Sequence, residues 1–267
     1  MTDFSLNRNG VALVTGAAGS IGRACVEAFA ANGAAVVLAD VEPQTEAMDR
    51  LLADVGSRYP DARGSVHACD VADADDVERL AAQIDDRWGR VDYLALVAGI
   101  LHEARPVEAV PLEDWDRVLG VNLRGPFLLT LALVPLMRRQ PTGSIVAIAS
   151  WYGRLGHAFF GPYCASKAGL IVLTQVLAAE LAGAGIRANS VSPGNVDTPM
   201  HHQGLEDEAV QREITYEEMR EIEWRKIPLG VPSAAGDIAN AVLFLCSDAA
   251  SSITGASIDV NGGVLLR

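Results

Sequence analysis

The sequence predicts an α/β fold: a doubly wound, parallel, seven-stranded sheet with helices on both faces, forming a single domain over residues 1–267. Short apolar runs without polar alternation recur along the chain, as is typical of strands buried on both faces. Stretches of helical length separate these runs, and that alternation is the pattern of parallel strands joined by crossover helices. No segment rich in Pro, Gly or Ser divides the chain into domains.

The expected strands follow one another from the N-terminus to the C-terminus. They are residues 11–14, 34–39, 66–71, 93–99, 144–149, 187–192 and 257–260. Helices are expected after the first strand through Ala31, and over residues 74–89, 112–138 and 163–182. Pro126 lies inside the third of these helices and predicts a break or kink, because proline removes a backbone N–H and clashes with the preceding turn.

A glycine turn joins the first strand to the first helix. It reads Thr15-Gly16-Ala-Ala-Gly19-Ser-Ile-Gly22, and the next strand leads to Asp40, 18 residues after Gly22. Glycines let the backbone approach a pyrophosphate, and a helix N-terminus offers free N–H donors to it. A carboxylate at the end of the second strand suits ribose hydroxyls. This βαβ unit therefore predicts a Rossmann-type dinucleotide site.

Asp40 also bears on which dinucleotide is bound. Its charge would repel a 2′-phosphate, whereas a bare ribose can donate hydrogen bonds to it. The neighbouring positions offer no positive charge, since residue 41 is Val and residues 17 and 18 are Ala. We therefore expect NAD to be preferred over NADP.

The stretch from Ser150 to Lys167 carries the expected chemistry. Tyr163 and Lys167 are four residues apart, so they share one face of a helix. An ammonium beside a phenol favours the phenolate and is expected to lower the pKa of Tyr163, which suits a general acid/base. Ser150 ends the preceding strand, where open parallel sheets place their ligands, so its hydroxyl is expected to hold a substrate oxygen.

Residues 200–226 interrupt the alternation after the sixth strand. They combine eight acidic residues with Tyr216, Met219, Ile222 and Trp224. Two interpretations stay open: a solvated pair of acidic helices, and a lid that covers the substrate. Several of the loop residues Trp151, Tyr152, His157, Phe159 and Phe160 are expected to border the same space, and His102 is a further candidate. The acidic residues there disfavour anionic substrates.

Composition limits the classes of partner. The net charge of −13 argues against nucleic acid and anionic membranes. The four cysteines are far apart without a C-x-x-C pair, so neither a metal site nor a disulfide framework is expected.

The first five residues lack a signal-peptide pattern. The longest apolar run, residues 127–137, is shorter than the roughly 20 residues of a membrane helix. A cytoplasmic location is expected.

These motifs together resemble the short-chain dehydrogenase/reductase family, in its compact single-domain branch. The resemblance covers essentially the whole chain, including the thirteen-residue step from Ser150 to Tyr163. Two positions depart from the family pattern. Ser20 stands where the family usually has Gly, and Leu96-Val97 replaces two asparagines, which puts local bracing of that strand in doubt. The carriers are Thr15-Gly16, Gly22, Cys69-Asp70-Val71, Ala98-Gly99, Asn122, Ser150, Tyr163, Lys167, Pro193-Gly194, Thr198, Met200, Ile253-Thr254-Gly255, Val260 and Gly262-Gly263.

The resemblance implies a role for each matched residue. The implied catalytic set is Asn122, Ser150, Tyr163 and Lys167, with Asn122 holding a water in a proton relay. The expected substrate contacts are Ser150, Tyr152, His157, Tyr163 and Met200. Of these, Tyr152 and His157 are expected from their place in the loop between Ser150 and Tyr163. The implied cofactor contacts are Gly16, Ala18, Gly19, Ser20, Ile21, Gly22, Asp40, Val41, Asp70, Val71, Ala98, Gly99, Tyr163, Lys167, Pro193, Gly194, Val196 and Thr198.

The expected activity is NAD-dependent interconversion of a secondary alcohol, such as a polyol or cyclic diol, and its ketone. Two alternatives remain: reduction of 3-oxoacyl thioesters, and dinucleotide sensing without turnover. The complete Ser150, Tyr163 and Lys167 set argues against a sensor. The helix over residues 170–181 is apolar nearly all round, so a second subunit is expected to cover part of it, in a tetramer or a dimer.

Overall fold

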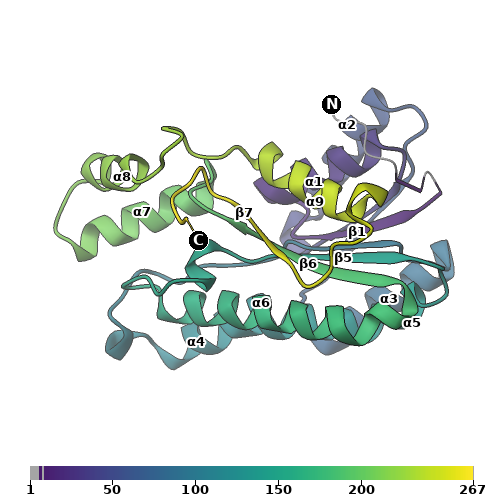
Figure 1. Cartoon of the computed structure of the whole chain (residues 1–267), viewed down its shortest axis with the longest axis horizontal. Coiled ribbons are helices and arrows are strands. Elements are labelled where there is room, and N and C mark those ends of the chain that lie inside the picture. The colour runs from purple at the N-terminus through teal and green to yellow at the C-terminus, as the bar shows by residue number, and fades with distance from the viewer. Residues whose placement is uncertain (1–5, 8, 267) are drawn as a thin grey trace.

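The computed structural model describes residues 6–7 and 9–266, so the first five residues, on which the signal-peptide prediction rests, lie outside the described part. The fold is one parallel seven-stranded sheet with the strand order β3-β2-β1-β4-β5-β6-β7. Helices cover both faces of this sheet (Figure 1). The predicted Rossmann-type fold class is confirmed. The strands are β1 (Val11–Thr15), β2 (Ala35–Asp40), β3 (Gly64–Ala68), β4 (Tyr93–Leu96), β5 (Gly143–Ile148), β6 (Ile186–Pro193) and β7 (Ser257–Val260).

One face of the sheet is covered by α1 (Ser20–Ala31), α2 (Thr45–Arg58) and α9 (Ala235–Cys246). Of these, α1 is predicted from the sequence, whereas α2 and α9 are additional. Helix α2 buries Met48, Leu51 and Val55, which are spaced as one helical face requires. These side chains join the core formed with β1 and β2.

The opposite face is covered by α3 (Ala74–Trp88), α5 (Gly125–Met137) and α6 (Gly161–Leu181), and α4 (Leu112–Leu119) packs against α6. A π-helical segment, Gly120–Arg124, joins α4 to α5 and ends just before Pro126. The predicted interruption is therefore present, and it lies on the N-terminal side of the proline. The remaining short helices are 3-10 turns at Glu42–Gln44, Val107–Ala109, Trp151–Gly153, Ala182–Ala184 and Asp248–Ala250.

Two helical stretches are longer than residues 127–137, the apolar run whose shortness argues against a membrane span. By length and composition alone, Leu112–Met137 and Gly161–Ala184 could each cross a bilayer, so the length argument is wrong for them. Core helices of soluble proteins pass the same test. Here 39% and 44% of their most apolar windows are buried, through contacts with the sheet.

Residues 200–226 form two helices, α7 (Pro199–Gln211) and α8 (Tyr216–Arg225), which project beyond one end of the sheet (Figure 1). They pack on each other through a small cluster that includes Leu205, Ala209 and Met219. A capping box at Thr215 begins α8. The pair therefore has its own apolar contacts, and we call it the lid segment.

Candidate active site

A cavity of about 560 Å³ lies at the carboxyl ends of the central strands, between the sheet and the lid segment. Loops following β1, β4, β5 and β6 contribute to its walls, as does α7. This is the edge at which open parallel sheets bind ligands. The cavity therefore unites the glycine turn and the Ser150–Lys167 stretch, which are more than a hundred residues apart in sequence.

The glycine turn forms one end of the cavity. Gly16 has a φ of +63°, and a Cβ on it would lie 2.8 Å from the Cα of Ala98. A Cβ on Gly22 would lie 2.0 Å from the carbonyl oxygen of Gly16, so no larger residue fits there without a shift. Gly19 precedes α1 as its N-cap residue. The free N–H groups of this helix start are thus presented at the cavity, as an anion requires.

Asp40 lines the same end of the cavity. Its Oδ2 accepts a hydrogen bond of 3.0 Å from the N–H of Ala18, and its Oδ1 accepts one of 2.8 Å from the N–H of Val41. These bonds fix the carboxylate beside the glycine turn, and each oxygen keeps further acceptor capacity.

The strand segment in which Leu96-Val97 replaces two asparagines is braced by Thr15. The Thr15 hydroxyl accepts hydrogen bonds from the N–H groups of Val97 and Ala98, at 3.1 and 3.2 Å. Gly99 follows, and a Cβ on it would lie 3.2 Å from Lys167 Nζ and 3.4 Å from Asn122 Oδ1. Thr15 thus supplies the bracing that the sequence departure leaves in doubt.

All expected cofactor contacts line this cavity. Beyond those already placed, they come from the start of α1, from the loop after β3, and from the end of β6 and the loop that leads to α7. They are Ser20, Ile21, Asp70, Val71, Pro193, Gly194, Val196 and Thr198.

Tyr163, Ser150 and Lys167 also line the cavity. Burial raises the pKa of Tyr163 to about 12, although a hydrogen bond with the Ser150 side chain acts to lower it. Burial lowers the pKa of Lys167 to about 8. Lys167 Nζ lies 5.6 Å from the centre of the Tyr163 ring. The expected lowering of the Tyr163 pKa by Lys167 is therefore not found, because desolvation of the phenol dominates.

Asn122 lies on the π-helical segment and is fully buried. Its Oδ1 accepts a 2.8 Å bond from the N–H of Ile100, while its Nδ2 donates to the Ile100 carbonyl at 2.9 Å and to Ser166 Oγ at 3.2 Å. These bonds join the end of β4 to α6. The side chain is thus engaged across the fold and does not bond its own helix.

The aromatic loop after β5 borders the cavity only in part. Trp151, Tyr152 and Phe160 line it, and so does Met200 at the start of α7. His157 stands behind Tyr152, with ring centres 4.2 Å apart and planes inclined by 13°. Three of the five loop residues therefore line the cavity, whereas His157, Phe159 and His102 are not among the lining residues. Their side chains pack the loop instead, as the T-shaped contact of His102 with Phe160 illustrates.

The family model described as enoyl-(acyl carrier protein) reductase matches residues 16–265. The chain belongs to the short-chain dehydrogenase/reductase family. Members of this family are oxidoreductases that act on CH–OH groups with a nicotinamide dinucleotide, and this chain is such an enzyme.

Individual relatives of the family differ in their substrates. The chain is 37% identical over 256 residues to a 3-oxoacyl-(acyl-carrier-protein) reductase of Thermotoga maritima, covering 96% of this chain and 98% of the relative. It is 37% identical over 269 residues to a D-threitol dehydrogenase of Mycolicibacterium smegmatis, covering 99% and 96%. Its structure resembles that of an NAD+-bound xylitol dehydrogenase with a TM-score of 0.89, at 29% identity and with 96% and 98% of the chains covered.

In this member of the short-chain dehydrogenase/reductase family, two residues of α7 that were not predicted as site residues also line the cavity. They are Glu208 and His201. Glu208 is 1% exposed, although it lies in a run of acidic residues. Burial is the largest influence on the pKa of His201 and lowers it to about 4. Leu205 and Glu208 are three residues apart, so they share one face of α7. Because Leu205 is apolar, this spacing is the signal that could have indicated an inward-facing carboxylate.

Proposed function

We propose that the protein is an NAD-dependent dehydrogenase/reductase that interconverts a small secondary alcohol, of the polyol or cyclic diol class, and its ketone. The observation that carries this proposal is that one cavity is lined by the side chains of Ser150, Tyr163 and Lys167 together with Asp40. Two hydroxyls that line the same partly desolvated cavity can hold the oxygen of an alcohol or a ketone between them.

The residues divide the work as follows. Ser150 orients the substrate oxygen, and Tyr163 accepts its proton during oxidation or donates one during reduction. Lys167 is held by the Ile148 carbonyl with its ammonium 5.6 Å from the centre of the Tyr163 ring, where it would bind the nicotinamide ribose. Asn122 holds the end of β4 against α6, beside Lys167. The cofactor, when bound, supplies the hydride acceptor or donor.

The cavity fits a nicotinamide dinucleotide by its own geometry. The glycine turn leaves no room for side chains at positions 16 and 22, so backbone N–H groups can contact a pyrophosphate. Asp40, at the end of β2, would bind the adenosine ribose hydroxyls, and Thr198 would hold the nicotinamide carboxamide. The carboxylate of Asp40 supports the choice of NAD over NADP, because it repels a 2′-phosphate.

The polyol or cyclic diol class is supported by the lining of the cavity. Aromatic and aliphatic side chains alternate there with the polar groups of Tyr152, His201 and Glu208. Relatives named as D-threitol and xylitol dehydrogenases act on polyhydroxy alcohols, as their names state. A small molecule with several hydroxyls can satisfy such a mixed surface.

Reduction of a 3-oxoacyl thioester is the second candidate, supported by the similarity to the Thermotoga maritima reductase. Against it stands the buried carboxylate of Glu208, because an acyl chain would place apolar atoms against an oxygen that keeps acceptor capacity. Dinucleotide sensing without turnover leaves the Ser150, Tyr163 and Lys167 set unexplained.

The test is a measurement of nicotinamide absorbance with NAD and NADP across polyols, cyclic diols, hydroxy acids and 3-hydroxyacyl thioesters. We expect the highest kcat/KM for a polyol or cyclic diol with NAD. More efficient turnover of an acyl thioester would transfer the assignment to the second candidate. Absence of turnover with every compound, in both directions, would leave the sensing alternative.

A further inference from the structure

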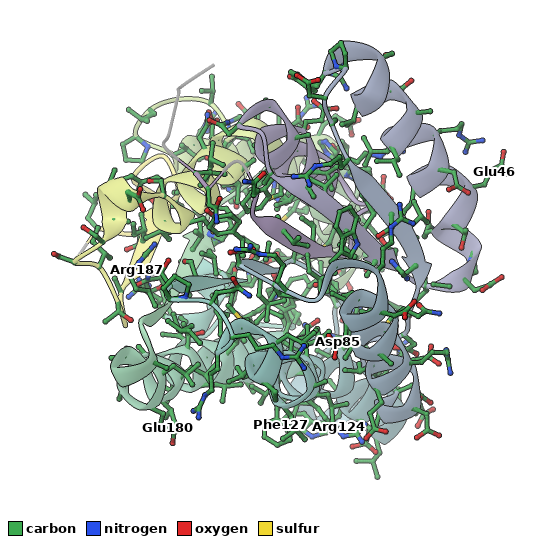
Figure 2. The ribbon with its side chains drawn as sticks, turned by 90° about the vertical axis from the view of Figure 1, so that its right-hand side faces the viewer. Glu46, Asp85, Arg124, Phe127, Glu180 and Arg187 are labelled. Carbon is green, nitrogen blue, oxygen red and sulfur yellow. The ribbon has the colours of Figure 1, made fainter. Side chains whose placement is uncertain are left out.

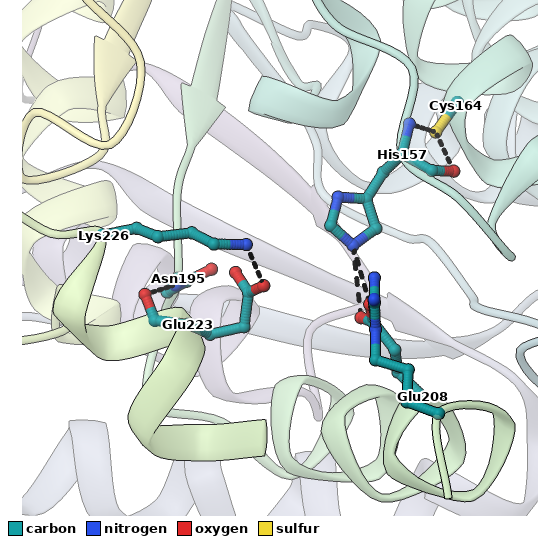
Figure 3. Close-up of polar contacts among 7 residues, drawn as sticks. His157, Cys164, Asn195, Glu208, Glu223 and Lys226 are labelled. Atoms are coloured by element: carbon teal, nitrogen blue, oxygen red, sulfur yellow. Dashed lines mark hydrogen bonds and ion pairs between the residues drawn. The ribbon is translucent and has the colours of Figure 1, made fainter. Parts of the chain in front are cut away.

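The lid segment contains two buried carboxylates, Glu208 on α7 and Glu223 on α8, each 1% exposed. Glu208 forms an ion pair with Arg212, four residues later in sequence. Glu223 forms one with Lys226, three residues later (Figure 3). The basic side chains are 41% and 43% exposed. The pairs are therefore balanced in charge, but the negative end of each pair is buried while the positive end is in contact with solvent.

Only one of these two carboxylates belongs to the catalytic cavity, because Glu208 lines it and Glu223 does not. His157 Nε2 lies 3.3 and 3.2 Å from Oε1 and Oε2 of Glu208, and Arg212 Nε donates to Oε1 at 2.8 Å. A carboxylate accepts about four hydrogen bonds. Oε2 thus receives one long bond from His157 and keeps acceptor capacity.

A chain of ring contacts fixes this carboxylate relative to the catalytic phenol. His157 stacks on Tyr152 at 4.2 Å, and Tyr152 meets Tyr163 edge-on at 6.1 Å. The main-chain N–H of His157 also donates a hydrogen bond of 3.4 Å to the Sγ of Cys164 (Figure 3). Cys164 directly follows Tyr163 in the sequence. Glu208 is therefore held at a defined place on the lid side of the reacting centre.

Another residue of the same cavity wall, His201, has a ring nitrogen without a hydrogen-bond partner among the described residues. This nitrogen is Nε2, and it is buried. A buried polar atom without a partner costs free energy unless a ligand or water satisfies it. Glu208 and His201 thus add one acceptor and one further polar nitrogen to the same wall.

We propose that Glu208 is a specificity-determining residue, whose carboxylate accepts a hydrogen bond from a hydroxyl of the substrate remote from the reacting carbon. This inference rests on the proposed function and deepens it, since it names the group that separates polyhydroxy alcohols from simple alcohols. His157 is the positioning residue that holds the carboxylate. A substrate without a second hydroxyl leaves the remaining acceptor capacity of Oε2 unfilled, and unfilled buried acceptors are how polar sites reject analogues.

The charge balance indicates a neutral hydrogen-bond donor. The ligand atoms of His157, Glu208 and Glu223 lie within 4.8 Å of one another, which on distance alone also suits a divalent cation. Arg212 and Lys226 already neutralise both carboxylates, so a metal ion or an ammonium group would add uncompensated positive charge to a buried site. A hydroxyl adds no charge and satisfies the free acceptor.

The experiment compares cyclohexanol with the 1,2-, 1,3- and 1,4-cyclohexanediols, using the wild-type protein, Glu208→Gln and Glu223→Gln. For the wild type, we expect the best diol to exceed cyclohexanol in kcat/KM by roughly 10- to 100-fold, as a hydrogen bond to a charged acceptor allows. Glu208→Gln should remove most of that advantage: through a higher KM, kcat/KM for the diol should fall by roughly tenfold more than kcat/KM for cyclohexanol. Glu223→Gln is the matched control, because it removes an equally buried carboxylate behind the cavity; it should keep the wild-type ratio.

Three results would overturn the inference. If the diol-to-cyclohexanol ratio of kcat/KM is unchanged in Glu208→Gln, the proposed hydrogen bond from the substrate to Glu208 is not formed. If Glu223→Gln lowers this ratio equally, the preference depends on the fold of the lid segment and not on the Glu208 carboxylate. If Glu208→Gln does not fold, the wild-type comparison still decides, since equal efficiency for cyclohexanol and every diol contradicts a second hydroxyl site. Turnover of these alcohols without preference removes only this inference, whereas absence of turnover with all alcohols and ketones also removes the proposed function.

Discussion

Lys167 Nζ donates a 2.8 Å hydrogen bond to the main-chain carbonyl of Ile148, the last residue of β5. This bond links α6 to the strand that leads to Ser150. It also holds an ammonium group that is 3% exposed close to the Tyr163 ring. The position of the positive charge is therefore set by the end of a strand, and does not depend on a flexible side chain alone.

The first prediction concerns the proton-transfer group. Tyr163→Phe keeps the ring and removes only the hydroxyl, so kcat should fall by about 10²- to 10⁴-fold, the usual contribution of general acid/base catalysis. Cofactor binding, measured as quenching of intrinsic fluorescence by NADH, should stay within about threefold of the wild type, since no binding group at the glycine turn changes. Retention of more than roughly a tenth of wild-type kcat would contradict the assignment of Tyr163 as the acid/base.

The second prediction concerns cofactor choice. The wild type should use NAD with kcat/KM at least about tenfold above that for NADP, because the Asp40 carboxylate repels a 2′-phosphate. Asp40→Ala should lower efficiency with NAD and raise it with NADP. Val41→Ala, which changes the neighbouring cavity residue without changing charge, is the control and should leave the ratio unchanged. A wild-type preference for NADP would refute the role given to Asp40.

The third prediction concerns stability in acid. Burial lowers the pKa of His201 to about 4, so the unfolded chain takes up a proton below pH 6.5 that the folded chain does not. The wild type should therefore lose stability as pH falls from 6.5 to 4, by about 2 to 3 kcal/mol from this group. His201→Asn should lose correspondingly less. The comparison is made by urea unfolding at pH 7 and pH 4.5, and equal losses in the two proteins would argue against a buried neutral His201.

The fourth prediction concerns assembly. Exposed apolar side chains lie on the two helices that cover one face of the sheet: Phe127 and Leu131 on α5, and Val172 and Val176 on α6. Figure 2 shows Phe127 and Glu180 pointing outward on the same side of the molecule. Apolar surface of this kind is covered in oligomers, so sedimentation equilibrium at micromolar concentration should show a tetramer or a dimer.

Leu131→Asp should weaken this assembly, because association would bury the introduced charge. Val210→Asp is the matched control on the lid segment, where an equally exposed apolar residue should tolerate the charge. A monomeric wild-type protein would contradict the prediction, and dissociation by Val210→Asp alone would move the interface to the lid.

The fifth prediction concerns the lid segment, residues 200–226. Few contacts tie it to the body of the protein: one is the bond from Asn195 Nδ2 to the Glu223 carbonyl, and another is the contact of Glu208 with His157. Amide hydrogen exchange in α7 and α8 should slow when NAD and an alcohol substrate are both present, because the substrate joins the lid to the sheet. Exchange unaffected by both ligands together would rule out closure over the substrate.

The sequence by itself determined the parallel sheet, because strands buried on both faces are continuous apolar runs whatever surrounds them. It also predicts which residues carry the chemistry, since the glycine turn and the Tyr163–Lys167 spacing are local patterns. Helix α2 can be predicted from the sequence as well, because Met48, Leu51 and Val55 mark its buried face. In each case the signal lies within a few residues of the chain.

The tertiary structure alone decided how those residues behave. Burial, which depends on the whole fold, raises the pKa of Tyr163, whereas the spacing to Lys167 predicts the opposite. Glu208 and His157 are 51 residues apart, and only the packing of α7 against the loop after β5 brings them together. Sequence spacing describes neighbours along one helix or strand. The surroundings of a side chain come from segments that are distant in the chain, so desolvation and substrate contacts are settled only when the chain folds.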